Sequence, residues 1–169
     1  MLSVRNNYLQ LNGDNAIKVN NLSIADGAPF VLKLKIHADS ATAALSRALQ
    51  SNSEKLLLFI DCNSGTVTRK IAFKCSNIEI KELHILSTSE LGDIDFVVAY
   101  DDTTKKLIYK WNGKVLYNAV QTKTLGLISD IYLCNRSDEG RPLTGGFYEF
   151  KVYNYYDEQL LWWTIIQFI

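Results

Sequence analysis

The sequence predicts an all-β protein, an antiparallel β-sandwich of two sheets in a jelly-roll arrangement. Polar and apolar residues alternate with period two over several segments, and turn-forming residues separate those segments. Such alternation is typical of a strand with one face in the core and the other in solvent. We therefore expect about ten short strands joined by turns. The length of 169 residues predicts a single domain over residues 1–169.

The first half of the chain shows the alternation most clearly in residues 30–37. One face holds Phe30, Leu32, Leu34 and Ile36, and the opposite face holds Val31, Lys33, Lys35 and His37. The run Leu56–Ile60 is instead apolar throughout, which is typical of a central strand covered on both faces. Alternation returns in Val67–Cys75 and in Ile94–Asp101, which we also interpret as strands.

Turn signals lie between these segments, at Asn63–Gly65 and at Asp101–Lys105. The dipeptide Asn112–Gly113 is the strongest hairpin signal in the chain, because both residues tolerate the positive φ angles of a type I′ turn. We therefore expect the strands on either side of Asn112–Gly113 to pair with each other.

Two segments break the strand pattern. In residues 40–51, Ala41, Ala44, Leu45, Ala48 and Leu49 recur at helical spacing, and Asp39 or Ser40 can cap the helix. This predicts a short helix or helical loop packed on a sheet edge. Asp157 can begin a second helical turn, because an acidic Glu158 favours the helix N-terminus.

Composition is that of an ordinary globular protein, with 47% hydrophobic and 21% charged residues. The 18 basic and 18 acidic residues cancel, so charge gives no reason to expect nucleic acid or an anionic membrane as a partner. The N-terminus lacks the apolar core of a signal peptide. The longest apolar run, Leu160–Ile169, is shorter than the ~20 residues of a membrane-spanning helix. We expect neither secretion through a signal peptide nor membrane insertion.

The chain has three cysteines, Cys62, Cys75 and Cys134, an odd number without a close pair. This favours reduced thiols and folding in a reducing cytoplasm over a disulfide framework. Later incorporation of the folded protein into a virion or other particle is compatible with this expectation.

Five motifs occur in an order that is known from one family. They are Tyr8–Gly13, Pro29–Ile36, Phe96–Asp101, Leu107–Val115 and the closing segment Gly145–Asn154. Together they resemble the laminin-G-like domains of the concanavalin A-like lectin–glucanase superfamily. The resemblance implies two antiparallel sheets in a jelly roll, with the first and last strands close together. It also implies that the protein binds glycans, proteins or lipids, often through rim loops and sometimes through calcium.

Some enzymes of that superfamily cut β-glucans with clustered acidic residues on one strand. Retaining glycosidases need two carboxyl groups about 5–5.5 Å apart. The comparable cluster here is Glu90–Asp95, where Asp93 and Asp95 would share a face at a strand entrance. The two histidines, His37 and His84, have no nucleophile at motif spacing. We therefore expect no catalytic residues and no enzymatic activity.

Polar residues in the expected turns, together with one hairpin tryptophan, are the candidates for a ligand-binding rim, because the loops of a sandwich gather at its ends. The candidates are Asp61, Asn63, Asp101, Asp102, Trp111, Asn135, Arg136 and Asp138. Carboxylates and carbonyls in such loops also suit calcium, so we expect no cofactor unless it is calcium. The alternative is that Asp and Asn occupy turns for local backbone reasons.

Aromatic residues are a second basis for glycan binding, because sugars stack on aromatic faces beside hydrogen-bonding groups. The hairpin is flanked by Tyr109, Trp111 and Tyr117, and the closing strand is surrounded by Tyr153, Tyr155 and Tyr156. Packing in the core and across strands is the alternative interpretation. Tyr155 and Tyr156 are the hardest pair to bury together, because adjacent strand residues point to opposite faces.

The C-terminal run is the candidate contact with another chain, because both faces of a strand there would be apolar. The candidate contact residues are Tyr155, Tyr156, Trp162, Trp163 and Phe168. The alternative is a central strand covered by the opposite sheet and by the helix expected in residues 40–51.

These observations predict a non-catalytic, lectin-like recognition and assembly module. The expected setting is a larger complex, such as a capsid decoration or fibre protein on a virion surface. A glycan-binding module, assisted by calcium, is the alternative within the binding class. A glycoside hydrolase or lyase is the alternative within the enzyme class. The expected partners are protein subunits of an assembly and glycans.

Overall fold

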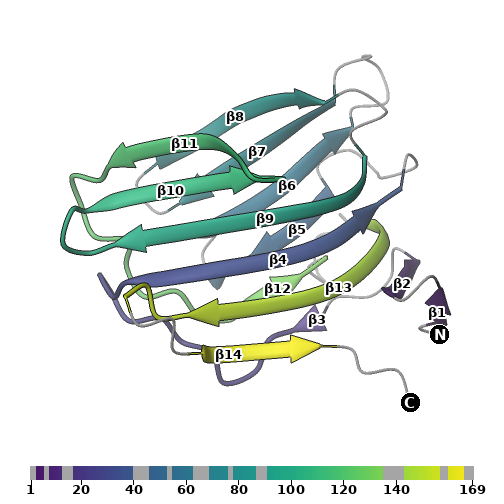
Figure 1. The fold of residues 1–169 in the computed structure, drawn as a ribbon, viewed down its shortest axis with the longest axis horizontal. Helices are drawn as coiled ribbons and strands as arrows, with labels where there is room; N and C mark the ends of the chain where they lie inside the picture. The colour runs from purple at the N-terminus through teal and green to yellow at the C-terminus, as the bar shows by residue number, and fades with distance from the viewer. Residues whose placement is uncertain are drawn as a thin grey trace.

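The computed structural model describes residues 3–5, 8–12, 17–39, 46–52, 55–62, 69–75, 78–86, 91–134, 143–156 and 160–165. Within these residues, fourteen strands form two antiparallel sheets that pack face to face (Figure 1). The predicted all-β sandwich is therefore confirmed. In the described part of the chain, the structure contains no helix long and apolar enough to cross a lipid bilayer.

The eight-stranded sheet lies in front in Figure 1. Its order is β1 (Ser3–Arg5), β2 (Tyr8–Asn12), β13 (Thr144–Tyr153), β4 (Phe30–Ala38), β9 (Gly92–Asp101), β10 (Lys106–Trp111) and β11 (Lys114–Val120), with β14 (Leu160–Ile165) also paired to β13. The six-stranded sheet has the order β3 (Ile17–Lys18), β12 (Tyr132–Leu133), β5 (Ser46–Gln50), β6 (Leu56–Cys62), β7 (Arg69–Cys75) and β8 (Ile78–Leu86).

The core fills the space between the two sheets. The four apolar residues of β4 predicted to face inward, Phe30, Leu32, Leu34 and Ile36, are all buried. They belong to the same apolar cluster as Leu58 and Phe73 of the six-stranded sheet. The opposite residues of β4 lie on the solvent side of the eight-stranded sheet, which we call the outer face.

The first and last strands lie together, as the resemblance implied. β2 pairs with the first part of β13, where Leu9 is opposite Phe147. β14 pairs with the second part of the same edge of β13, where Ile165 is opposite Glu149. The other edge of β13 is paired with β4 along its length. Strands β2 and β14, which come from opposite ends of the sequence, therefore both lie beside β13 (Figure 1).

The predicted hairpin joins β10 and β11. Asn112 and Gly113 have φ angles of 45° and 78°, in the left-handed region that a type I′ turn requires. Asn112 also exchanges two hydrogen bonds with Asp95. Its backbone N donates to the Asp95 carbonyl at 2.9 Å, and its Oδ1 accepts from the Asp95 backbone N at 2.8 Å. These contacts attach the hairpin to the neighbouring strand β9.

The apolar run Leu56–Ile60 forms most of β6, between β5 and β7. All five residues are buried, so the prediction of a central strand covered on both faces is confirmed. Leu57, Phe59 and Ala72 form a second apolar cluster, separate from the main core.

The helix predicted in residues 40–51 is wrong where the structure describes that segment. Ser46–Gln50 is strand β5, and all five residues are buried. It pairs with β6 on one side and β12 on the other. Ala48 and Leu49 are both buried, as all of β5 is, and their recurrence after Ala41, Ala44 and Leu45 imitates helical spacing in the sequence. Hydrogen bonding to two neighbouring strands therefore overrides the local pattern. Residues 40–45 lie outside the described residues, as does the helical turn expected at residues 157–159.

The C-terminal strand is at an edge of the sheet. Among the described residues, β14 pairs with β13 alone. The alternative of a central strand covered by the opposite sheet and by a helix is therefore wrong in the strand's position among the described residues, and the described part of the expected helix, Ser46–Gln50, is strand β5. Phe168 lies outside the described residues.

Cys75 and Cys134 are free thiols buried in the core. Burial raises the pKa of Cys75 to about 12, and it raises the pKa of Cys134 further. The two thiols are therefore protonated and chemically quiet at neutral pH, in agreement with the predicted reduced state.

Candidate functional site

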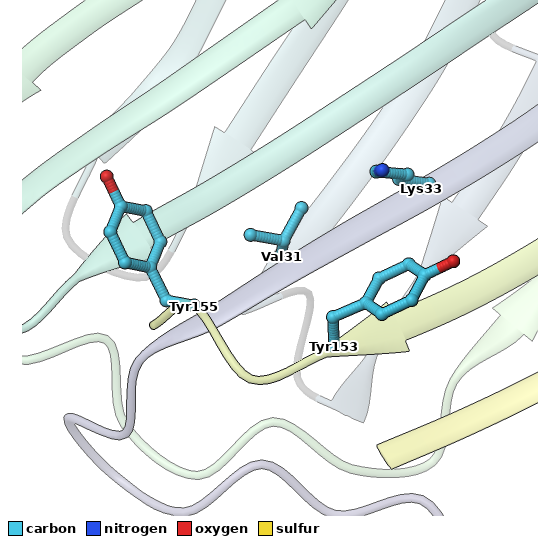
Figure 2. A pocket seen from close by; sticks show the side chains of 4 residues that line it. All are labelled: Val31, Lys33, Tyr153 and Tyr155. Atoms are coloured by element: carbon cyan, nitrogen blue, oxygen red, sulfur yellow. The ribbon is translucent and has the colours of Figure 1, made fainter. Parts of the chain in front are cut away.

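The outer face carries a small open pocket lined by Val31, Lys33, Tyr153 and Tyr155. Val31 and Lys33 come from β4, and Tyr153 is the last residue of β13. Val31 and Tyr153 are directly opposite in the antiparallel pairing, so their side chains share a face. Tyr155 follows in the turn after β13. Figure 2 shows Val31 between the two tyrosine rings, with Lys33 beside Tyr153.

The pocket combines aromatic faces with one cationic group. The Lys33 ammonium lies 5.0 Å from the centre of the Tyr153 ring, within the range of a cation–π contact. The pocket volume is about 120 Å³. Pockets that enclose drug-sized ligands have about 300–1,000 Å³. This pocket is therefore suited to one small ring or one terminal group, held at the surface.

Tyr155 is positioned by its neighbour. The rings of Tyr155 and Tyr156 meet edge to face, with centroids 5.3 Å apart. The Tyr156 hydroxyl lies 2.7 Å from Oδ1 of Asp101 and 2.6 Å from Oδ1 of Asp102. It also lies 2.7 Å from the Thr103 hydroxyl. The turn that carries Tyr155 is therefore tied to the 101–104 loop.

Asp101 and Asp102 are two of the predicted rim-loop residues. Through the Tyr156 hydroxyl, they join the 101–104 loop to the turn that follows β13. Asp101 accepts hydrogen bonds from the Thr103 backbone N at 2.9 Å and from the Thr104 hydroxyl. The Thr104 hydroxyl, followed by Tyr156, lowers the pKa of Asp101 to about 2. Hydrogen bonding to Asp102 is the largest cause of the raised pKa of Tyr156. Asp101 is therefore ionised, and Tyr156 neutral, over the ordinary pH range.

A second polar cluster lies further along the outer face, where β4, β9 and β13 are adjacent. Nδ1 of His37 is 2.7 Å from Oδ1 of Asp93, and the Tyr148 hydroxyl donates to the same oxygen at 2.7 Å. The His37 hydrogen bond is the largest cause of the lowered pKa of Asp93. Lys35 lies 5.4 Å from the centre of the Tyr148 ring. Tyr148 reaches this cluster from a β-bulge, where the β13–β4 register shifts between Phe147 and Glu149.

Other predicted site residues fall elsewhere. Trp111 is only 6% exposed, because the period of β10 places it on the inner face with Leu107 and Tyr109. It is a core residue, not a member of a ligand-binding rim. Trp162 and Trp163 lie in β14, opposite Val152 and Lys151 of β13. Asp61 lies near the end of β6, opposite Lys70. Asn63, Asn135, Arg136 and Asp138 lie outside the described residues.

The structure brings together residues that the sequence did not combine. Val31 and Lys33 belonged to the solvent face of a predicted strand, and Tyr153 and Tyr155 to the aromatic group of the closing strand. The missing information was the pairing of β4 with β13 and its register, since 122 positions separate Val31 from Tyr153 in the chain. Within the described residues, no three His, Cys, Asp or Glu side chains converge as a metal ion would require.

No family model matches the chain, and no curated protein matches it either. Solved structures match at low sequence identity. One is tailspike protein 2 from an Escherichia coli O157:H7 bacteriophage, with 11% identity and a TM-score of 0.65 over 94% of this chain. The chain spans only 26% of that tailspike.

Two smaller domains match as well. The CBM40 of Ruminococcus gnavus IT-sialidase, bound to α2,3-sialyllactose, aligns with 82% of this chain and 91% of its own, at 10% identity and a TM-score of 0.52. Domain 4 of AbnA, a GH43 extracellular arabinanase from Geobacillus stearothermophilus in complex with arabinotriose, aligns with 92% of this chain and 72% of its own, at 12% identity and a TM-score of 0.56. The fold is a concanavalin-like jelly roll. At these identities the likeness concerns the fold alone.

Proposed function

We propose that the protein is a non-catalytic module that binds a saccharide on the outer face of the eight-stranded sheet. The observation that carries this proposal is the pocket, in which Tyr153 and Tyr155 flank the apolar side chain of Val31 beside the Lys33 ammonium (Figure 2). Sugars combine apolar ring faces with hydroxyl groups, so a site of aromatic rings and few polar groups suits them.

The structural neighbours support this reading. The R. gnavus and G. stearothermophilus domains are described with bound sialyllactose and arabinotriose, on folds similar to this one. We also propose that the chain is a laminin-G-like domain, on the basis of its five sequence motifs.

Asp93, which belongs to the acidic cluster predicted from the sequence, does not suit the role of general acid in glycoside hydrolysis. A general acid in a glycosidase needs a raised pKa, so that it holds a proton at working pH. The hydrogen bond with His37, followed by that with Tyr148, instead lowers the pKa of Asp93. An oligosaccharide hydrolysis screen is therefore expected to stay at background. Turnover that is lost in the Asp93→Asn or Asp95→Asn variant would show that the protein is an enzyme.

A glycan array tests the binding proposal directly. The protein should bind at least one saccharide, and Tyr155→Leu should reduce that binding because it removes an aromatic face from the pocket. Tyr132→Leu is the matched control, because Tyr132 is half-buried like Tyr155 but lies in the other sheet. Equal loss in both variants, or retained binding in Tyr155→Leu, would place the site elsewhere. Parallel arrays with calcium and with a chelator test the proposed calcium assistance.

An assembly role is the second candidate, and the observation that favours it is the position of β14. An edge strand presents unpaired backbone groups to other chains, and β14 is such a strand among the described residues. We propose that the protein is a subunit of a virion surface structure, as the sequence analysis expected. The likeness to a phage tailspike is compatible with this role. Truncation after Gln159 should remove self-association or partner binding in sedimentation measurements while β-structure persists in circular dichroism. Unfolding of the truncated chain would assign β14 to the domain's own stability instead.

A further inference from the structure

We propose that the pocket selects an acidic saccharide and that the Lys33 ammonium binds its carboxylate or sulfate group. This inference rests on the proposed saccharide-binding function and specifies the ligand class. It follows from the distribution of charge on the outer face around the pocket.

Lys33 has no acidic neighbour at the adjacent positions of its own face. In the sheet register it lies between Lys151 of β13 and Val97 of β9. Along β4, the next residues on the same face are Val31 and Lys35. An anion at Lys33 would therefore meet a cation that no cross-strand carboxylate balances.

Lys35, two residues further along the same face, has the opposite surroundings. Its cross-strand neighbours are Glu149 of β13 and Asp95 of β9. Two lysines on one strand and one face thus differ in whether acidic side chains flank them. This difference makes Lys35 a matched control for Lys33.

The nearest acidic residue on the β13 side is engaged with another lysine. Glu149 Oε2 lies 2.6 Å from Lys151 Nζ, and this hydrogen bond is the largest cause of the raised pKa of Lys151. The charge of Glu149 is therefore balanced by Lys151. The Tyr153 ring attracts the Lys33 ammonium through its π-electrons but leaves its charge uncompensated.

The same distribution orients the ligand. On the Tyr155 side of the pocket, Asp101 and Asp102 converge on Tyr156, whose ring touches Tyr155. These carboxylates disfavour an anion at that end. We therefore expect the acidic group at Lys33 and the apolar face of the sugar ring at Tyr155, with Val31 between them (Figure 2).

The test uses paired saccharides that differ in one acidic group. Methyl glucoside is compared with methyl glucuronide, galactose with galactose 6-sulfate, and lactose with sialyllactose. Affinities are measured by calorimetry or by ligand-observed NMR. The wild-type protein should bind the acidic member of at least one pair roughly tenfold more tightly, the size of one charge-assisted hydrogen bond. Higher salt should reduce this preference.

Lys33→Met should remove the preference for the acidic member over the neutral member of each pair. Lys35→Met should retain the preference. The carboxylated and sulfated pairs show which acidic group the site accepts. Equal affinity for both members of every pair, or equal effects of the two lysine variants, would overturn the inference while leaving saccharide binding in place. Absence of binding to any saccharide on the array would instead refute the proposed function.

Discussion

The hydroxyl of Tyr156 lies 2.6 Å from Oδ1 of Asp102, although 54 positions separate the two residues in the sequence. The same hydroxyl lies 2.7 Å from Oδ1 of Asp101. A phenol has one proton to donate, so the two carboxylates share it while the Thr103 backbone N donates to the phenol oxygen at 3.3 Å. This contact joins the turn that carries Tyr155 to the loop between β9 and β10. It explains how the half-buried Tyr155 and the exposed Tyr156 can keep a defined position.

Tyr156→Phe should raise the pKa of Asp101 from about 2 towards its ordinary value, because one of its hydrogen-bond donors is lost. Carboxyl NMR titration measures this shift. Tyr148→Phe is the reciprocal control. It should raise the pKa of Asp93, to which Tyr148 donates, and leave that of Asp101 unchanged. An unchanged Asp101 pKa in Tyr156→Phe would mean that the Thr103 and Thr104 contacts alone hold the carboxylate.

Low pH should reduce the free energy of unfolding, and protonation of Asp101 should account for part of that reduction. Its pKa is lower in the folded protein than the ordinary 3.8, so its stabilising contribution is complete above about pH 4. That contribution is lost as the pH falls towards about 2. In urea unfolding at a series of pH values, the difference in midpoint between wild type and Asp101→Asn should shrink across this window. A constant difference from pH 5 to pH 2 would contradict this assignment.

Gly145→Ala should destabilise the protein strongly, by roughly 3 kcal/mol or more. Gly145 has a φ angle of 142°, and a Cβ there would lie 1.9 Å from the His37 carbonyl oxygen of β4. Gly113→Ala is the matched control. Gly113 also has a positive φ, at 78°, but nothing lies within 4 Å of its added Cβ. Gly113→Ala should lower the free energy of unfolding by only about 1–2 kcal/mol, because the left-handed conformation is its only source of strain. Equal costs in denaturant unfolding would show that the β13–β4 approach is looser than described.

Tyr109→Phe should leave the protein equally stable or up to about 1 kcal/mol more stable. The Tyr109 side chain is fully buried, stacked on Phe73 at 5.0 Å, and its hydroxyl has no hydrogen-bond partner among the described residues. Removing the hydroxyl removes a desolvated polar group and keeps the ring. A loss of more than about 1 kcal/mol in urea unfolding would reveal a partner for the hydroxyl.

Much of the fold could be predicted from local sequence patterns. The inward residues of β4 follow from period-two alternation, and the β10–β11 hairpin follows from the φ angles that Asn112 and Gly113 tolerate. The same period predicts which side of β4 faces solvent, and that side carries Val31 and Lys33. These features depend on residues that are close together in the sequence, so the sequence by itself determined them.

The pocket could not be predicted in this way, because it depends on pairing between distant strands. The register of β13 against β4 sets Tyr153 opposite Val31, and the bulge at Tyr148 turns that side chain towards Asp93. Tertiary pairing also decided that Ser46–Gln50 is a strand. A helix-like spacing or an aromatic beside a turn carries no information about the partner strand. Only the hydrogen-bonded neighbours of each segment choose its conformation and the face that each side chain occupies.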